Sequence, residues 1–471
     1  MNKLFFHLLL FGFLFSSSFN SNSQSVNSLA ENSYDLSIKR FSEALRIRTI
    51  SSDDPSVFDS SAFRQMKNFL EKSFPFVHAN LERTCINEFG YIYRWEGIDK
   101  NKDPLVLLAH QDVVPVEEAA EKLWTYPAFS GAIKNDTVWG RGAVDDKGTL
   151  IAILEAAENL LQNNQHPLRT VYFCFGHDEE TSGHYGAESI AKWFSDRNIH
   201  PFLVLDEGLE IIHKNYIPLK TPVALIGVGE KGYATFEVTS RIEGGHSAAP
   251  KRETAITILS DALKKVNDDP MPAVLINTVN LFLTSIKNEL PGKMRFAISN
   301  LWLFKKKLLK EMAKNNGTNS LIRTTIVTTM INSGVKDNVI PSFATATINC
   351  RILPGETVEE VENFLTRQIN DERIFIKRTS ACWNPPPMTS TESGAYKLID
   401  SLTKKIFPQV VTAPLFVVGT TDARFFRSLS EGVINFIPVF DSKGMHGVDE
   451  RRSINDYLNL IFFFEQLMLC N

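Results

Sequence analysis

The chain has few cysteines and no excess of charge of either sign, and both shortages exclude classes of protein. Five cysteines occur in 471 residues, and no two have the C-x-x-C spacing of a zinc or redox motif, so a disulfide scaffold is not expected. The chain contains 50 Lys and Arg residues and 54 Asp and Glu residues, which gives a net charge of -4. No nucleic-acid partner is expected, because phosphate binding requires concentrated positive charge. The basic cluster Lys305–Lys307 is interpreted as the solvated face of a helix.

A long apolar run is also missing. The segment from Leu4 to Phe15 follows Lys3 and precedes the small, polar residues Ser16 to Ser25. It is shorter than the roughly 20 apolar residues that a membrane span needs. We interpret residues 1–25 as a signal peptide of a secreted or periplasmic protein, with no stable membrane span after its removal. The alternative is a membrane anchor, if the segment is retained.

Short apolar runs alternate with helical patterns in the first half of the chain. Pro104–Ala109, Thr170–Gly176 and Pro201–Leu205 are typical of buried strands, and helices fit between them at Lys147–Leu161 and Gly186–Phe194. Strands that alternate with helices predict a mostly parallel sheet with helices on both faces. The expected fold class is therefore α/β.

The pattern changes at a glycine-rich hinge near Gly227. The segments that follow show period-two alternation, which is typical of half-exposed strands, and two helical segments lie between them. The order is strand 233–241, helix 253–266, strands 323–331 and 344–352, helix 356–369, strand 373–379. This order predicts a ferredoxin-like α+β domain at 227–381, with a helical insertion at about 279–315. The α/β domain is then expected in two parts, 30–226 and 382–471.

Polar residues follow each of the three predicted buried strands. His110-Gln111-Asp112 follows the first strand, His177 to Glu180 the second, and Asp206-Glu207 the third. Ligands of open α/β sheets bind beyond the carboxyl ends of the strands. Carboxylates crowded there repel one another unless a cation lies among them, and zinc accepts His together with Asp or Glu. Together with Asp145-Asp146, the pattern predicts a divalent metal site.

Five motifs occur in order along the chain. They are His110 to Pro115, Gly140 to Gly148, Asp178-Glu179-Glu180, Leu205 to Gly208 and Met445-His446-Gly447. In these motifs the chain resembles the co-catalytic zinc metallopeptidases, which include aminoacylase, carboxypeptidase S and the glutamate carboxypeptidases. Within that family it is most similar to the branch of carboxypeptidase S and the secreted N-fatty-acyl-amino-acid synthase/hydrolase. The resemblance implies that the α/β domain is catalytic and that 227–381 is a lid or dimerisation domain.

The resemblance also implies a dinuclear centre with two Zn2+ ions, for which Co2+ or Mn2+ are alternatives. Asp145 would bridge the two ions. His110 and Asp206 would complete one ion, and Glu180 and His446 the other.

Further roles follow from the same resemblance. Asp112 would accept the ring N–H of His110 and raise its basicity. Glu179 would act as the general base. The peptide bond between Asp145 and Asp146 is expected to be cis.

Residues outside the metal ligands are expected to contact the substrate. His246 would reach the partner subunit's active site and stabilise the oxyanion there, which implies a homodimer through the lid domain. Asn338 and Arg351 suit recognition of a substrate carboxylate, since the arginine fork donates two parallel bonds; a structural strand-end role is the alternative for Arg351. Gly419 and Thr420 would shape the pocket floor, or form a plain turn.

The leading hypothesis is zinc-dependent hydrolysis of an amide bond in a substrate with a free carboxylate, either a peptide's C-terminal bond or an N-acyl amino acid. A reversible N-fatty-acyl-amino-acid hydrolase/synthase is the alternative enzyme, and some of the 34 phenylalanines would line its acyl pocket. A non-catalytic, metal-binding dimeric interaction protein is the alternative of another class. Glu179 argues against it, because a site that only binds metal needs no base.

Overall fold

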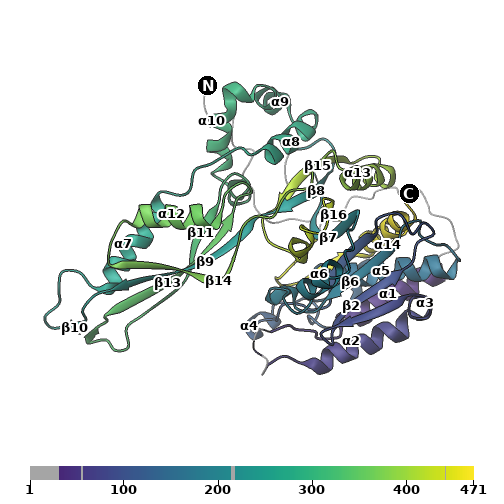
Figure 1. The fold of residues 1–471 in the computed structure, drawn as a ribbon, viewed down its shortest axis with the longest axis horizontal. Coiled ribbons are helices and arrows are strands. Elements are labelled where there is room, and N and C mark those ends of the chain that lie inside the picture. Colours follow the sequence, from purple (N-terminus) through teal and green to yellow (C-terminus); the bar gives the residue numbers. More distant parts are fainter. Residues whose placement is uncertain (1–30, 53, 55–56, 214–217, 441, 471) are drawn as a thin grey trace.

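The structure is a computed structural model and describes residues 31–52, 54, 57–213, 218–440 and 442–470 (Figure 1). The predicted signal peptide at 1–25 lies outside the described residues. In the described part of the chain, no helix is both long and apolar enough to cross a membrane.

An eight-stranded sheet forms the centre of the larger part of the molecule. Its strand order is β1-β2-β6-β3-β7-β16-β8-β15. The central strands β6, β3, β7 and β16 run parallel, whereas β1, β2 and β8 join through antiparallel pairing. The strands are β1 Glu82–Ile86, β2 Gly90–Trp95, β3 Leu105–His110, β6 Val171–Gly176, β7 Leu203–Ile212, β8 Val223–Glu230, β15 Val411–Val417 and β16 Val433–Phe440. The predicted α/β fold is confirmed.

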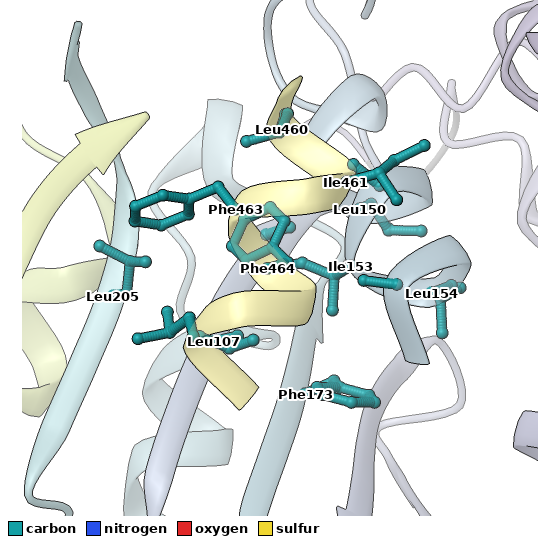
Figure 2. Packing of buried hydrophobic residues seen from close by; sticks show 14 of the residues in the cluster. Leu107, Leu150, Ile153, Leu154, Phe173, Leu205, Leu460, Ile461, Phe463 and Phe464 are labelled. Carbon is teal, nitrogen blue, oxygen red and sulfur yellow. The ribbon is translucent and has the colours of Figure 1, made fainter. Parts of the chain in front are cut away.

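Helices cover both faces of this sheet because its central strands are apolar on both sides. On one face, α5 and α14 pack Leu150 and Phe463 over Leu107 and Leu205 (Figure 2). On the other face, α6 and the short helix η3 pack on the alternate side chains of the same strands. The helices of this part are α1 Glu31–Leu45, α2 Ser60–Ser73, α3 Pro75–Asn80, α4 Glu118–Glu121, α5 Lys147–Gln162, η1 Glu179–Thr181, α6 Ala187–Ser195, α13 Gly394–Ile406, η3 Asp422–Phe426 and α14 Ile454–Leu469.

A second, four-stranded antiparallel sheet extends away from the first (Figure 1). Its order is β11-β13-β9-β14, and α7 and α12 cover one face, so that every second residue of β9 and β13 is buried. The elements are β9 Gly232–Arg241, α7 Ala255–Asp268, β11 Thr325–Ser333, β13 Phe343–Ile352, α12 Val358–Ile369 and β14 Ile374–Trp383. This order agrees with the alternation expected from the sequence.

The helical insertion belongs to the smaller part in sequence but packs against the larger sheet. Phe282 and Leu283 of α8 share an apolar cluster with Leu225 of β8 and Leu415 of β15. The apolar stripe of α8 therefore covers the edge of the larger sheet, and α9 and α10 lie beyond it (Figure 1). The insertion contains α8 Asn277–Ile286, η2 Lys287–Glu289, α9 Gly292–Ser299, α10 Leu301–Met312 and α11 Asn316–Ser320.

Two small sheets complete the fold. One joins the segment before α5 to the segment before α14, in the order β17-β5-β4. The other pairs β10 with β12 at the tip of the smaller part. Their strands are β4 Ala132–Lys134, β5 Thr137–Trp139, β17 Arg451–Ser453, β10 Gly245–His246 and β12 Val339–Ile340.

Candidate metal centre

Asp145 lies between two histidines that come from opposite ends of the chain. Its Oδ1 is 2.8 Å from His110 Nε2, and its Oδ2 is 2.8 Å from His446 Nε2. Glu180 Oε2 lies 3.2 Å from the same His446 nitrogen. His110 ends β3, Asp145 precedes α5, and Glu180 follows β6, so the carboxyl ends of the strands bring these side chains together. Each oxygen of Asp145 thus faces a different set of donors, as a bridging carboxylate requires.

A second set of donors surrounds His110. Ligand atoms of His110, Asp146 and Glu207 lie within 4.8 Å of one another, and so do those of His110, Asp145 and Glu180. Glu207 Oε1 is 3.3 Å from His110 Nε2. The peptide bond between Asp145 and Asp146 is cis, as the resemblance implies.

The structure brings Glu207, and not Asp206, into contact with His110. Neighbouring residues of the extended strand β7 point to opposite sides. Asp206 Oδ2 instead accepts the N–H of Ala423 at 2.7 Å. Sequence reasoning placed Asp206 among the ligands and overlooked Glu207, because two adjacent carboxylates at a strand end look alike in sequence. The role of Asp206 stays a prediction, and the geometry favours Glu207.

The Asp112 carboxylate holds His110 and the loop after β6 together. It lies 3.3 Å from His110 Nδ1 and accepts the N–H groups of Glu179 and Glu180 at 3.2 and 3.1 Å. The hydroxyl of Ser51 donates to it at 2.7 Å. Burial opposes ionisation of Asp112, but the hydrogen bond and charge of His110, together with the hydrogen bonds from Ser51 and the Glu180 backbone, outweigh burial and lower its pKa. No signal in the sequence around Ser51 pointed to this contact.

The Glu179 carboxylate is outside both donor sets, whereas its neighbour Glu180 is inside one. Burial, reinforced by the charges of Asp422 and Glu207, raises the pKa of Glu179 well above its ordinary value. The backbone of Glu179 is thus held beside the site by its hydrogen bond to Asp112. Among the described contacts, its carboxylate forms no hydrogen bond or ion pair with His110 or His446.

The charge balance of the site fits divalent cations. Burial and repulsion from Asp145 and Asp146 raise the pKa of Glu207 well above its ordinary value. Both carboxylate oxygens of Asp146 and Oε1 of Glu180 are buried without a hydrogen-bond partner among the described residues. Buried acceptors without donors are costly. Metal ligation would satisfy these oxygens and offset the repulsion.

A buried ion pair connects the two loops that carry Asp145 and His446. Glu450 accepts Arg141 Nη1 at 2.6 Å and the N–H groups of Val144 and Asp145 at 2.8 and 3.1 Å. Arg141 Nη2 also donates to the carbonyl of Gly447 at 3.2 Å. Sequence reasoning gave neither residue a role, although Arg141 lies within the glycine-rich motif.

His246 and Asn338 lie together, but not at the metal donors of their own chain. β10 pairs with β12, and the N–H of Ser247 donates to the Asn338 carbonyl at 3.2 Å. Figure 1 shows β10 at the far tip of the smaller part, well away from β6 and β7. Within one chain, these two residues are remote from Asp145.

Arg351 belongs to a stack that joins the two parts of the molecule. Its guanidinium lies 4.6 Å from the Tyr233 ring, which stacks on Trp383 with 4.8 Å between centroids. Arg424 covers Trp383 at 5.1 Å and donates to the Ser182 carbonyl at 2.5 Å. Arg351 is therefore linked through stacked rings to the loop that follows Glu180.

Gly419 and Thr420 are half-buried in the loop between β15 and η3. Directly after them, the N–H of Thr421 donates to Glu230 at 2.8 Å, and the N–H of Ala423 donates to Asp206. This loop thus borders the end of β7, and its contact with substrate stays a prediction.

Comparisons with known proteins find relatives that match most of the chain. The model of peptidase family M20/M25/M40 matches residues 106–469. The chain is 38% identical over 438 residues to the probable carboxypeptidase S-like 2 of Dictyostelium discoideum, covering 91% of this chain and 84% of that protein. It is 36% identical over 421 residues to the human N-fatty-acyl-amino acid synthase/hydrolase PM20D1, covering 87% and 83%.

Solved structures show the same fold. An M20 family metallo-carboxypeptidase of Sulfolobus solfataricus matches with a TM-score of 0.66 and 21% identity over 92% of this chain and 98% of that one. A dinuclear metal-binding M20 peptidase of Bacillus subtilis matches with a TM-score of 0.59 and 13% identity over 93% and 97%.

Proposed function

The chain belongs to peptidase family M20/M25/M40 and is a metallohydrolase, and we propose that it cleaves an amide bond beside a free carboxylate at a dinuclear metal centre. The observation that carries the proposal is Asp145, whose two carboxylate oxygens each lie 2.8 Å from a different histidine, Oδ1 from His110 and Oδ2 from His446. His110 with Glu207 or Asp206 would hold one ion, and His446 with Glu180 the other. When bound, the pair of ions would polarise the carbonyl and acidify water.

The chain's own residues move the proton. Glu179 takes a proton from the attacking water and returns it to the departing amine nitrogen. The two N–H bonds to Asp112 keep the Glu179-Glu180 backbone in place, so the base and the ligand keep separate positions. Asp112 also orients the His110 ring.

Recognition of the substrate carboxylate falls to Arg351 and Asn338. Arg351 is half-buried and held against Tyr233, which supports a fixed fork for a carboxylate. Asn338 and His246 share the tip of the smaller part, so both would act in a partner subunit's site, Asn338 on the substrate carboxylate and His246 on the oxyanion. Gly419 and Thr420 would line the floor of the pocket.

The relatives support two substrate classes. One relative's name is carboxypeptidase S-like and another's is N-fatty-acyl-amino acid synthase/hydrolase. Both classes place the scissile amide next to an amino acid with a free carboxylate. A reversible N-fatty-acyl-amino-acid hydrolase/synthase is therefore the second candidate. Because residues 1–25 are predicted to be a signal peptide, we expect the protein to be secreted.

A substrate panel tests the proposal. N-acetyl amino acids, N-oleoyl amino acids and N-blocked dipeptides are compared with matched substrates whose terminal carboxylate is an amide. We expect hydrolysis only of the free acids, loss with a chelator, and recovery with Zn2+, Co2+ or Mn2+ to an extent that identifies the preferred ion. Hydrolysis that resists the chelator, or equal cleavage of the blocked amides, would contradict the mechanism.

A further inference from the structure

The corner formed by α9 and α10 exposes large apolar side chains. The exposed fractions are 83% for Trp302, 60% for Leu303 and 61% for Phe296. Phe296 packs edge-on against Phe304, with 5.9 Å between ring centroids, which joins α9 to α10. Figure 1 shows both helices at the periphery, beyond α8. Exposed apolar side chains gathered in one place mark an interaction surface.

The same corner, residues 291–310, is strongly basic. Its cationic residues are Lys293, Arg295, Lys305, Lys306, Lys307 and Lys310, and the segment contains no Asp or Glu. The whole chain has a net charge of -4, so this concentration of positive charge is local. It is complementary to an anionic surface.

The spacing along α10 separates an inner face from an outer face. Leu308 and Leu309 pack against the cluster that contains β15, and Met312 is buried. Trp302 and Lys306 are four residues apart and lie on the same side of the helix, as do Leu303 and Lys307. The outer face therefore presents apolar side chains in its first turn and lysines in the next two.

We propose that this α9–α10 corner docks on a lipid bilayer that contains anionic headgroups. Trp302, Leu303 and Phe296 would enter the boundary between headgroups and acyl chains, and the lysines would stay at the headgroup level. A protein partner is disfavoured because lysine is depleted in protein interfaces. The proposal does not depend on the proposed function.

Docking through this corner would orient the enzyme. Because α8 and α10 pack on β8 and β15, the corner is attached to the larger sheet, which also carries His110. The smaller part, with β10 at its tip, would then extend away from α9 and α10 (Figure 1). Apolar or amphipathic substrates in the bilayer would be concentrated next to the enzyme.

Sedimentation of the full chain with lipid vesicles tests this inference. The vesicles are phosphatidylcholine with or without phosphatidylserine. We expect binding that requires phosphatidylserine and weakens with salt, and about tenfold weaker binding for the double variant Trp302→Ser and Leu303→Ser. Lys306→Glu with Lys310→Glu should also reduce binding and its salt dependence.

A matched double variant controls for loss of exposed apolar area elsewhere. Ile98 and Leu123 are 72% and 69% exposed, and Ile98→Ser with Leu123→Ser should bind vesicles like the parent. All variants share the parent's N-terminal segment, so its contribution cancels. Equal vesicle binding by the parent and the Trp302 variant would overturn the proposal. A change of oligomeric state in that variant without a loss of vesicle binding would overturn it as well, in favour of a second copy as the occupant.

Discussion

Arg141 and Glu450 form a buried ion pair with 2.6 Å between Nη1 and Oε2. The pair holds the segment before α5 against the segment before α14, and these segments supply Asp145 and His446. Because Glu450 also accepts a hydrogen bond from the backbone N–H of Asp145, the ion pair fixes the position of Asp145 itself as well as that of its loop. The separation of Asp145 and His446 therefore depends on an ion pair between two residues that are not themselves among the proposed metal ligands.

Replacing Glu450 with Gln should weaken metal binding. The variant keeps the shape of the side chain but leaves Arg141 buried without its counter-charge. We expect metal affinity to fall by about 10- to 100-fold, as for other contacts that support ligands. Competition with a chelator measures this, and Glu88→Gln, in an exposed pair with Arg64, is the matched control. Unchanged metal affinity in Glu450→Gln would mean that the pair is structural only.

Glu179→Gln should separate catalysis from metal binding. The amide cannot take a proton from water, so turnover should fall by about 100-fold or more, while elemental analysis should still find the metal content of the parent. Glu180→Gln is the comparison, since Glu180 lies in a donor set, and it should lose metal as well as activity. Loss of metal from Glu179→Gln would overturn its assignment as the base.

The sequence predicted which strand ends bring histidine and carboxylate side chains together, but not which of two neighbours, Asp206 or Glu207, lies against His110. His110, Glu180 and Asp206-Glu207 each follow an apolar run, and that position alone brings them to one edge of the sheet. The choice between Asp206 and Glu207 depends on how β7 is rotated, which depends on packing from both faces. The contact of Ser51 with Asp112 is harder still to predict, because it arises only when the segment after α1 lies beside the segment after β3.

Asp206→Asn and Glu207→Gln resolve this choice. The Glu207 carboxylate lies 3.3 Å from His110 Nε2, whereas Asp206 binds a backbone N–H. We expect Glu207→Gln to lose one of the two metal ions per chain and Asp206→Asn to keep both with reduced stability. Loss of an ion in Asp206→Asn, with retention in Glu207→Gln, would support Asp206 as the ligand, as the resemblance implies.

Mixing two inactive variants tests the role of His246 across subunits. If His246 serves the partner's site, His246→Ala and Glu179→Gln chains should complement each other. Random pairing makes half of the dimers mixed, each with one intact site, so about one quarter of the parent activity should return. Light scattering checks that a dimer forms. No recovery in mixed dimers would contradict a role in the partner subunit.

The pH dependence of stability should show a contribution from Glu155. This residue of α5 is buried and paired with Arg40 of α1 at 3.0 Å, and burial raises its pKa to about 7. Between about pH 4.5 and 7 the unfolded chain loses this proton and the folded chain keeps it, so the free energy of unfolding falls as the pH rises.

Glu155→Gln removes this titration while it keeps an acceptor for Arg40. Over that pH range, the free energy of unfolding should fall by about 1–3 kcal/mol less in the variant than in the parent. Urea unfolding at several pH values measures this difference. Glu96→Gln, an exposed partner of Arg94, should follow the parent. Identical slopes for Glu155→Gln and the parent would show that Glu155 ionises normally in the folded state.

The smaller part was predictable for a different reason. The alternation in 233–241 and in 344–352 reflects strands with one buried face and one open face. This pattern does not depend on how the neighbouring domain is arranged. The packing of α8 was not predictable, because its apolar stripe would fit either sheet. In the structure, the stripe packs on β8 and β15 of the larger sheet.

Because His110 and His446 both contact Asp145, the order in which the chain is synthesised matters for assembly of the site. The second histidine leaves the ribosome only when nearly all of the polypeptide has been made. A nascent chain without residue 446 lacks one of the two histidines that contact Asp145, so it cannot yet complete the proposed metal centre. Any product of premature termination before residue 446 lacks this histidine and is therefore expected to be inactive.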